Sequence, residues 1–451
     1  MASIASSPYF VESVDLTHHP LCDVTIRTKA KYYYTLSYLV NQTVSEFITK
    51  TVSEAAKDNL KQHKTYIDRR LRQYKKIFLV NEGKTHFMMI KSENSLCSAI
   101  KELRHYQIFL VCDLALILYD ISLLRWAVNL ITNYLPNEQI KQLQDIVLAV
   151  TQPNIDLAKY PEIAGLALQF HANRAFSVLP TQRIIVTANM SAGKSTLINA
   201  LIGLPLARTS QEVCTGNIGY FLNKPYDDGR IHLCRAEVKL NASEDDLQSS
   251  QWDKPTHIAA YFTEAVPRKS PVCIIDTPGV DAALHQEHSQ ITYNALQNEN
   301  YSKVVYIVEP TNLGTDAEIK HLKWVAEHLK RKKILFVLNK MDGFQKDSDN
   351  MQESIEKLQE DLNKLGWEHP VICPISAYFG LLLKLKYTGQ SLTEDEEDEF
   401  EFYRRKFSRD YYDLSRFYYD AQVNPRDTEY IKLYKKSGLY GLEQRLYGGS
   451  L

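Results

Sequence analysis

The chain has 451 residues, of which 44% are hydrophobic and 24% charged, so it has enough apolar surface for a large core and is not a disordered protein. Lys plus Arg total 53 and Asp plus Glu total 54, and this balance argues against a nucleic-acid partner, whose phosphates attract a basic surface. The N-terminus lacks the basic start and apolar run of a secretory signal, so we expect a cytoplasmic protein.

The first 176 residues predict an antiparallel helical bundle, which we expect to form domain 1–176. Apolar residues recur at helical spacing from Leu36, and the pattern continues weakly toward Ile77, which predicts one long helix. Two brief strands are expected over 77–80 and 86–90, on either side of a turn. Further helices are expected over 95–134, 137–150 and 161–176.

The most apolar stretch of the chain runs over 108–131. It is interrupted by Asp113, Asp120 and Arg125, each of which is costly at the centre of a bilayer. A buried helix therefore explains this stretch better than a membrane span does.

After Pro180 the pattern changes to short β-branched runs that alternate with amphipathic helices, and we expect a second domain over 177–451. This alternation predicts an α/β fold, a mostly parallel sheet with helices on both faces. A helix that opens with a capping box is expected over 393–420, its charge run being interpreted as a solvated face. The predicted strands are Arg183–Ala188, Val272–Asp276, Val304–Val308, Ile334–Asn339 and Val371–Ile375.

A phosphate-binding loop follows the first of these strands. In such a loop, backbone N–H groups wrap the β-phosphate, Lys194 reaches the β- and γ-phosphates, and the Ser195 hydroxyl ligates Mg²⁺. The first glycine of the usual pattern is replaced by Ala188. The segment reads Ala188-Asn189-Met190-Ser191-Ala192-Gly193-Lys194-Ser195-Thr196 and leads into a helix over 197–202.

Three more motifs follow later strands. Asp276 in Asp276-Thr277-Pro278-Gly279 is expected to hold Mg²⁺ through water, and the Gly279 N–H to sense the γ-phosphate. Asn339-Lys340-Met341-Asp342 resembles the N-K-x-D motif, in which the aspartate accepts two hydrogen bonds from guanine and so selects GTP over ATP. Ser376-Ala377 resembles the loop that contacts guanine O6. Together they predict a P-loop GTPase domain.

The threonine that would bind Mg²⁺ in the switch loop is harder to assign. Thr209, Ser210 and Thr215 all follow the first helix. We choose Thr215 because Glu212-Val213-Cys214-Thr215-Gly216 sits just before the next strand, where GTPases place a Mg²⁺-binding threonine, with Thr209 as the alternative. His285 and His288, beyond the Asp276 motif, are interpreted as exposed loop histidines rather than catalytic bases.

These motifs together resemble the dynamin superfamily, especially bacterial dynamin-like proteins. The interval from Lys194 to Asp276 is 82 positions (276 − 194), as expected of an enlarged G domain. Eukaryotic dynamins have a glutamine where this chain has Met190, whereas Ser191 matches. The resemblance covers 181–446 and also draws on Leu313-Gly314-Thr315-Asp316 and on the closing segment Ser437-Gly438-Leu439-Tyr440-Gly441-Leu442-Glu443.

The resemblance implies hydrolysis of GTP to GDP and phosphate, stimulated when two G domains form a nucleotide-dependent homodimer. Lys194, Ser191 and Thr215 would be the catalytic residues, with a monovalent cation, K⁺ or Na⁺, beside Ser191. Such G domains are normally followed by long stalk and lipid-binding segments, so we expect either a fragment or a protein without that apparatus. A peripheral membrane or protein partner stays open.

Two alternatives to this enzyme follow from the sequence. The first is a slow nucleotide-dependent switch or scaffold that signals through its helices, which Ala188 and Met190 leave open. The second is a ribosome-assembly GTPase, which the lack of a basic RNA-binding segment disfavours.

Overall fold

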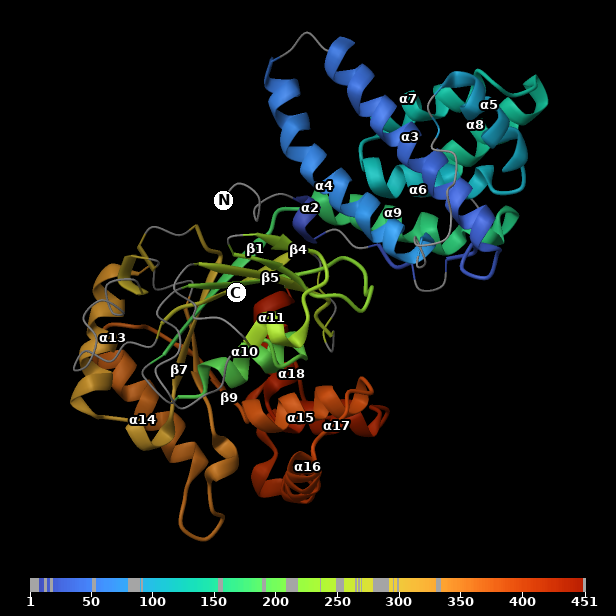
Figure 1. Ribbon diagram of the computed structural model, residues 1–451. Coiled ribbons are helices and arrows are strands. Elements are labelled where there is room, and N and C mark those ends of the chain that lie inside the picture. The colour runs from blue at the N-terminus through green and yellow to red at the C-terminus, as the bar shows by residue number, and fades with distance from the viewer. Residues whose placement is uncertain are drawn as a thin grey trace. The chain divides into compact units, whose positions relative to one another are not determined.

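The chain divides into two compact units, Met1–Val178 with Pro225–Gly229, and Leu179–Lys224 with Arg230–Leu451 (Figure 1). The computed structural model describes residues 8–11, 14–16, 19–50, 54–79, 90, 92–152, 157–188, 192–207, 218–235, 237–248, 255–263, 266, 268, 270–278, 292–294, 296–297, 300–329 and 334–448.

The first unit is helical. Helices α3 (Ile26–Lys50) and α4 (Glu54–Phe78) pack against each other, so the prediction of one long helix is wrong. Folding back lets each helix bury its narrow apolar stripe against the other, which a single straight helix could not do. The strand expected over 77–80 is also wrong at its start, because Ile77 belongs to α4; residues 81–89 lie outside the described part of the chain.

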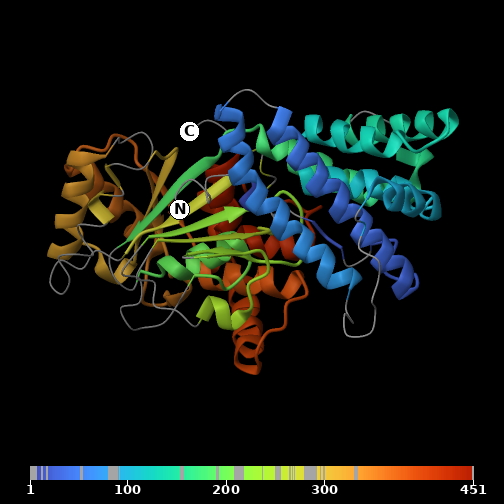
Figure 2. The ribbon, with the colours of Figure 1, turned by 45° about the horizontal axis from the view of Figure 1, so that its top comes forward.

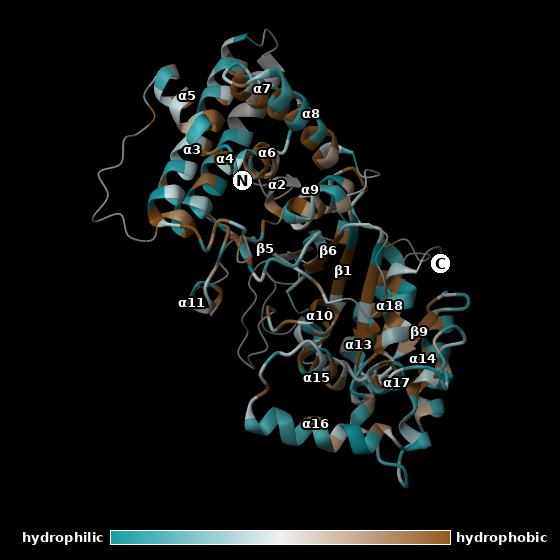
Figure 3. Ribbon diagram, turned by 90° about the vertical axis from the view of Figure 1, so that its right-hand side faces the viewer, coloured by the Kyte–Doolittle hydropathy of each residue, from teal (hydrophilic) through white to brown (hydrophobic). Residues whose placement is uncertain are grey.

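Helix α6 (Gln107–Leu118) is the centre of this unit. All of its residues except Ile108 are buried, and it packs against α3, α4, α7, α8 and α9 (Figure 3). The helical pattern predicted over 95–134 is divided by a turn over 103–106, and again at Tyr119, with φ 59°, and Asp120, which caps α7. The remaining helices are α2 (Pro8–Val11), α5 (Glu93–Glu102), α7 (Ile121–Thr132), α8 (Asn137–Thr151) and α9 (Ala164–Ser177), with single helical turns at Leu157–Lys159 and Pro161–Ile163.

Asp113 of α6 is fully buried inside this apolar core. Its carboxylate accepts hydrogen bonds from Tyr32 (2.5 Å), Tyr74 (2.8 Å) and His19 Nε2 (3.1 Å). His19 Nδ1 accepts the Leu21 N–H, so Nε2 carries the proton that is donated to Asp113. Three donors therefore compensate the desolvated carboxylate.

No helix in the described ranges is both long and apolar enough to cross a bilayer.

The second unit is built on a nine-stranded sheet in the order β4-β3-β5-β2-β6-β1-β7-β8-β9. Strands β6, β1, β7, β8 and β9 are parallel, so their carboxyl ends share one edge, whereas β2 pairs with β6 in the antiparallel sense. The bounds are β1 (Gln182–Ala188), β2 (Gly219–Asn223), β3 (His232–Cys234), β4 (Val238–Lys239), β5 (Thr256–Ala260), β6 (Val272–Asp276), β7 (Lys303–Val308), β8 (Ile334–Leu338) and β9 (Val371–Pro374).

Helices cover both faces of this sheet, as the alternating sequence pattern predicted (Figures 1 and 2). Helices α13 and α14 lie on one side, and α10, α15 and α18 on the other. The helices are α10 (Lys194–Ile202), α11 (Glu244–Gln248), α13 (Asp316–His328), α14 (Met351–Lys364), α15 (Ala377–Tyr387), α16 (Glu394–Phe407), α17 (Glu429–Lys436) and α18 (Leu439–Tyr447), with short turns at Pro310–Asn312, Met341–Gly343, Asp410–Tyr412 and Leu414–Phe417.

The helix predicted over 393–420 is shorter in the structure. It begins with the expected capping box, in which Thr393 Oγ accepts the Glu396 N–H and Glu396 accepts the Thr393 N–H, but it ends at Phe407. Beyond it the chain forms short turns, one of them capped by Asp413, whose side chain accepts the Ser415 N–H. Local capping by Asp413 competes with continuation of the helix.

A buried ion pair ties the helices on one face together. Lys384 of α15 and Glu443 of α18 are both 0% exposed, with Nζ 2.7 Å from Oε1. Lys384 also donates to the carbonyl oxygens of Leu201, at the end of α10, and Thr263, each at 3.1 Å. This network fixes the end of α10 to the C-terminal helices.

Candidate nucleotide-binding site

The four predicted motifs lie at the carboxyl ends of β1, β6, β8 and β9. Within them the structure describes Ala192, Gly193, Lys194, Ser195, Thr196, Asp276, Asn339, Lys340, Asp342, Ser376 and Ala377. Asn189, Met190, Ser191, Gly279 and Thr215 lie outside the described residues, as do Thr209, Ser210, His285 and His288.

The phosphate loop passes from β1 directly into α10. Ala188, which stands where the usual pattern has its first glycine, is the last residue of β1 and is fully buried. Gly193 adopts φ 86°, a conformation that favours glycine, and a Cβ at this position would lie 2.4 Å from Asn339 Nδ2. Ser195 and Thr196 are half-buried in the first turn of α10, where free backbone N–H groups attract anions.

Lys194 and Asp276 form an ion pair across the β1 and β6 ends. Asp276 is 1% exposed, and its second oxygen, Oδ2, has no hydrogen-bond partner among the described residues. A buried carboxylate oxygen without a donor among the described residues fits the oxygen ligands that Mg²⁺ takes in P-loop proteins, as does the hydroxyl of Ser195 at the start of α10.

Asn339 connects the phosphate loop to the base-binding loop. Its Nδ2 donates to the Ala192 carbonyl at 2.9 Å, and its Oδ1 accepts the Ala377 N–H at 3.0 Å. The side chain is 2% exposed, so both hydrogen bonds are shielded from water. Two segments that are far apart in the sequence are therefore held at a fixed separation by one amide.

The two loops expected to hold guanine also contact each other. Ser376 Oγ donates to Asp342 Oδ1 at 2.5 Å, while the Ser376 N–H donates to the Ser437 carbonyl at 2.9 Å. The next residue, Gly438, has φ 78°, and a Cβ there would lie 2.2 Å from the Pro374 carbonyl oxygen. The closing segment thus packs against the base-binding loop, and the residue at that contact must be glycine.

Lys340 adopts the left-handed conformation, with φ 60°, and its ammonium pairs with Glu309 at 2.9 Å. Glu309 directly follows β7, and sequence reasoning did not identify it. Both residues, with Asp342, line a cavity of ≈ 540 Å³ that extends to the start of α14. The ion pair directs the Lys340 side chain along the edge of the sheet that carries the other motifs.

Two residues of α16 that sequence reasoning missed also contact this region. Lys406 Nζ donates to the main-chain oxygen of Asp342 at 2.5 Å, so this member of the charge run is not part of a solvated face, whereas Glu394, Asp395, Glu401 and Arg405 are exposed. Tyr403 lies one turn earlier, and the charge of Asp342 contributes to raising its pKa. A signal was present, because Phe400, Tyr403 and Phe407 recur at helical spacing and predict an inward-facing side of α16.

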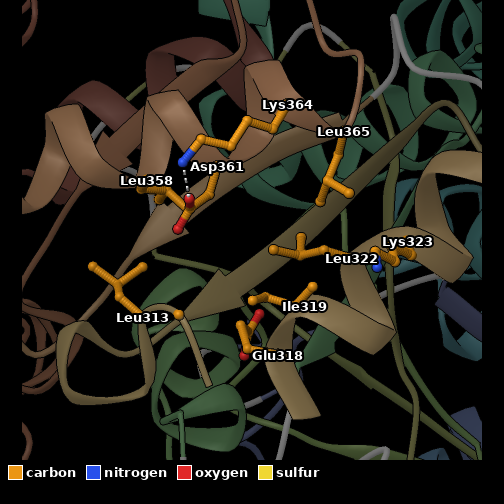
Figure 4. A pocket seen from close by; sticks show the side chains of 10 residues that line it. Leu313, Glu318, Ile319, Leu322, Lys323, Leu358, Asp361, Lys364 and Leu365 are labelled. Carbon is orange, nitrogen blue, oxygen red and sulfur yellow. Dashed lines mark hydrogen bonds and ion pairs between the residues drawn. The ribbon is translucent and has the colours of Figure 1, made fainter. Parts of the chain in front are cut away.

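A second pocket, of ≈ 260 Å³, lies between α13 and α14 (Figure 4). Its apolar lining consists of Leu313, Ile319, Leu322, Leu358 and Leu365, and the Lys364–Asp361 ion pair lies on the α14 side of the pocket. Gly314 of the dynamin-like segment also lines it, but none of the predicted nucleotide residues does. The pocket is separate from the candidate site.

The fold and the site geometry agree with the sequence comparisons. Residues 184–341, about a third of the chain, match the family model described as the Dynamin family. No curated protein sequence gave a significant match.

Similar solved structures share little sequence with this chain. A bacterial selenocysteine-specific elongation factor is 19% identical with a TM-score of 0.28, over 46% of this chain and 28% of its own. Era of Aquifex aeolicus, bound to GDP and AlF4⁻, is 15% identical with a TM-score of 0.29, over 48% of this chain and 59% of its own. The G domain of the T. maritima FeoB iron transporter is 14% identical with a TM-score of 0.27, over 47% and 100%.

The chain therefore spans less than two thirds of the elongation factor and of Era, and no function is transferred from these similarities. The prediction of a P-loop GTPase domain is instead supported by the sheet, by the order of the four motifs along the chain and by the family match. The second unit has the α/β fold of a P-loop GTPase domain, preceded in the chain by a helical region, and residues 184–341 are similar to the Dynamin family.

Proposed function

We propose that this chain is a dynamin-like GTPase, which binds GTP with Mg²⁺ and hydrolyses it to GDP and phosphate. The observation that carries the proposal is the pair of hydrogen bonds from Asn339 to Ala192 and Ala377. They bring the phosphate loop and the guanine loop together at one sheet edge, at which Lys194, Asp276 and Asp342 also lie.

Catalysis by this site would rest on positioning and charge stabilisation rather than on a covalent intermediate. Lys194 would exchange its ion pair with Asp276 for the β- and γ-phosphate oxygens, and the loop amides would stabilise the charge that develops on the transferred group. Ser195, Thr215 and Asp276 would hold Mg²⁺, which supplies charge neutralisation when bound. The Thr215 backbone would orient the attacking water, while Asn189, Met190 and Gly279 would complete the phosphate cradle.

Guanine recognition belongs to the second half of the site. Asp342 would accept hydrogen bonds from the ring N–H and the exocyclic amine of guanine, and adenine presents no such pair of donors. Lys340 would cover the base, and Ser376 and Ala377 would contact its O6 side. Equilibrium binding of a fluorescent GTP analogue, with GTP and ATP as competitors, tests the proposed selection of guanine over adenine. Equal competition by ATP would contradict it.

We also propose that two copies associate through their nucleotide faces, with Ser191 and a monovalent cation, K⁺ or Na⁺, taking the place of an arginine finger. An exposed γ-phosphate is partly solvated. A partner surface would exclude this water and strengthen the electrostatic effect of Lys194 on the phosphate. Light scattering without nucleotide, with GDP, and with GDP plus aluminium fluoride tests this. Dimers are expected with the mimic, and monomers in all three conditions would refute the proposal.

The proposed organisation is a helical domain, 1–176, that reports G-domain association to a peripheral membrane or protein partner in the cytoplasm. A slow switch or scaffold is the second candidate, which Ala188 and Met190, in place of the usual phosphate-loop residues, leave open. The lifetime of bound GTP separates the two candidates. Survival of bound GTP for hours at high protein concentration favours the switch.

A further inference from the structure

Helix α16 reaches the residue that would select guanine. The Lys406 ammonium donates to the Asp342 carbonyl at 2.5 Å, across 64 positions of sequence. The same ammonium lies 4.7 Å from the ring centroid of Tyr412, which favours the cation at this position. The peptide group of Asp342 is thus fixed by a charged donor from a different part of the chain.

Tyr403, three positions before Lys406 on the same face of α16, contacts Tyr378 and Phe379 of the helix that begins in the guanine loop, and it interacts electrostatically with Asp342. Burial, the charges of Asp342 and Glu399 and the interaction of the hydroxyl with Asp342 raise the pKa of Tyr403 to about 12. The phenol therefore keeps its proton near neutral pH and remains a hydrogen-bond donor beside the Asp342 carboxylate.

Aromatic contacts hold α16 against α15. The Phe379 ring stacks on Phe407 with centroids 4.8 Å apart and lies 5.9 Å from Tyr403, and Tyr378 meets Tyr403 edge-on at 6.1 Å. Helix α15 itself begins at Ala377, in the guanine loop. The helix that starts in the base-binding loop thus also positions Lys406 and Tyr403.

We infer that α16 forms an additional wall of the guanine site, in which Lys406 and Tyr403 are positioning residues that fix Asp342 for the 2-amino group of guanine. This inference rests on the proposed function. A carboxylate offers about four acceptor positions. Ser376 fills one, the guanine ring N–H and amine would fill two, and Tyr403 would fill the fourth, so the carboxylate keeps one orientation.

The test compares Lys406→Met and Tyr403→Phe with matched controls on the same helix interface. Lys386→Met removes the 2.6 Å ion pair between Lys386 of α15 and Glu397 of α16, and Tyr378→Phe removes the hydroxyl bonded to Glu399. Neither control residue contacts Asp342 in the interactions that the structure describes. Calorimetry with Mg²⁺ measures the dissociation constants for GDP and for inosine diphosphate, which lacks the 2-amino group.

Each test variant should weaken GDP binding by about 3- to 10-fold while inosine diphosphate changes less, so the preference for GDP falls. The control variants should keep the wild-type preference. Equal weakening of both nucleotides would indicate a merely structural role and overturn the inference, as would test variants that behave like the controls. If the unmodified chain binds no GDP, the proposed function itself fails and this inference with it.

Discussion

Replacement of Asn339 by alanine should separate the two halves of the candidate site. The side chain is 2% exposed and bonds the Ala192 carbonyl at 2.9 Å and the Ala377 N–H at 3.0 Å. Alanine removes both partners at once and leaves two shielded backbone groups without hydrogen bonds. The phosphate loop and the guanine loop would then no longer be held together by a side chain.

The expected cost follows from those two backbone groups. Each buried group left unsatisfied costs about 1–3 kcal/mol, so the two groups that Asn339→Ala leaves unpaired should together cost about 2–6 kcal/mol. Because the two bonds hold the nucleotide-binding geometry, part of this loss should appear as weaker nucleotide binding. We expect GDP affinity to fall by about 10- to 100-fold, since a tenfold change corresponds to about 1.4 kcal/mol.

Asn199→Ala is a matched control in the same unit. Asn199 is also buried and also bonds two backbone groups, the carbonyl (2.8 Å) and the N–H (2.6 Å) of Ala207, but it does not join the two loops. Urea unfolding and GDP calorimetry on both variants provide the comparison. Both should unfold more easily, and only Asn339→Ala should bind GDP much more weakly. Equal GDP affinities in the two variants would refute the bridging role.

Further predictions concern charge. Lys194→Ala should abolish binding of a fluorescent GTP analogue without unfolding the protein, because it removes the cation that would face the phosphates; unchanged affinity would contradict the loop assignment. Asp342→Asn should bind xanthosine triphosphate in preference to GTP in competition binding, and a retained preference for GTP would show that the base-binding loop was assigned to the wrong residues. Lys384→Met should lower the unfolding free energy by about 3–5 kcal/mol, because it leaves Glu443 buried without its cation, and a normal urea midpoint would count against this. Burial lowers the pKa of His321 to about 4, so below pH 6.5, the pKa of histidine in the unfolded chain, the unfolded chain binds a proton that the folded protein excludes. Between pH 7 and pH 5 the free energy of unfolding of the wild type should therefore fall by about 2 kcal/mol more than that of His321→Gln. Parallel pH profiles of the two proteins would contradict this.

The parallel half of the sheet could be predicted because its strands are buried on both faces. Runs such as Ile334–Leu338 are continuously apolar, and four of the five predicted runs end in a motif with its own chemistry. Strands β2, β3, β4 and β5 were not among the strands predicted. Strands β3 and β4 are only three and two residues long, too short for a period to emerge. The helix boundaries failed where tertiary packing decided them, as at Tyr119 in its left-handed conformation.

The candidate site shows the same division. Lys194, Asp276, Asn339 and Asp342 were predicted because the motif chemistry is local in sequence, although their nucleotide roles stay predictions. Glu309, Lys406 and the Lys384–Glu443 pair depend on contacts between distant segments, which spacing along the chain does not reveal. The Thr215 loop lies outside the described residues, so the choice between Thr215 and Thr209 stays a prediction.

The most direct test of the central proposal is phosphate release from GTP with Mg²⁺, measured over a range of protein concentrations for the wild type and for Lys194→Ala. The wild type should release phosphate from GTP but not from ATP, at a rate per molecule that rises with protein concentration, and the variant should release none above background. Equal release by the two proteins, or none from wild-type protein that binds GTP, would contradict the assignment of this chain as a GTPase.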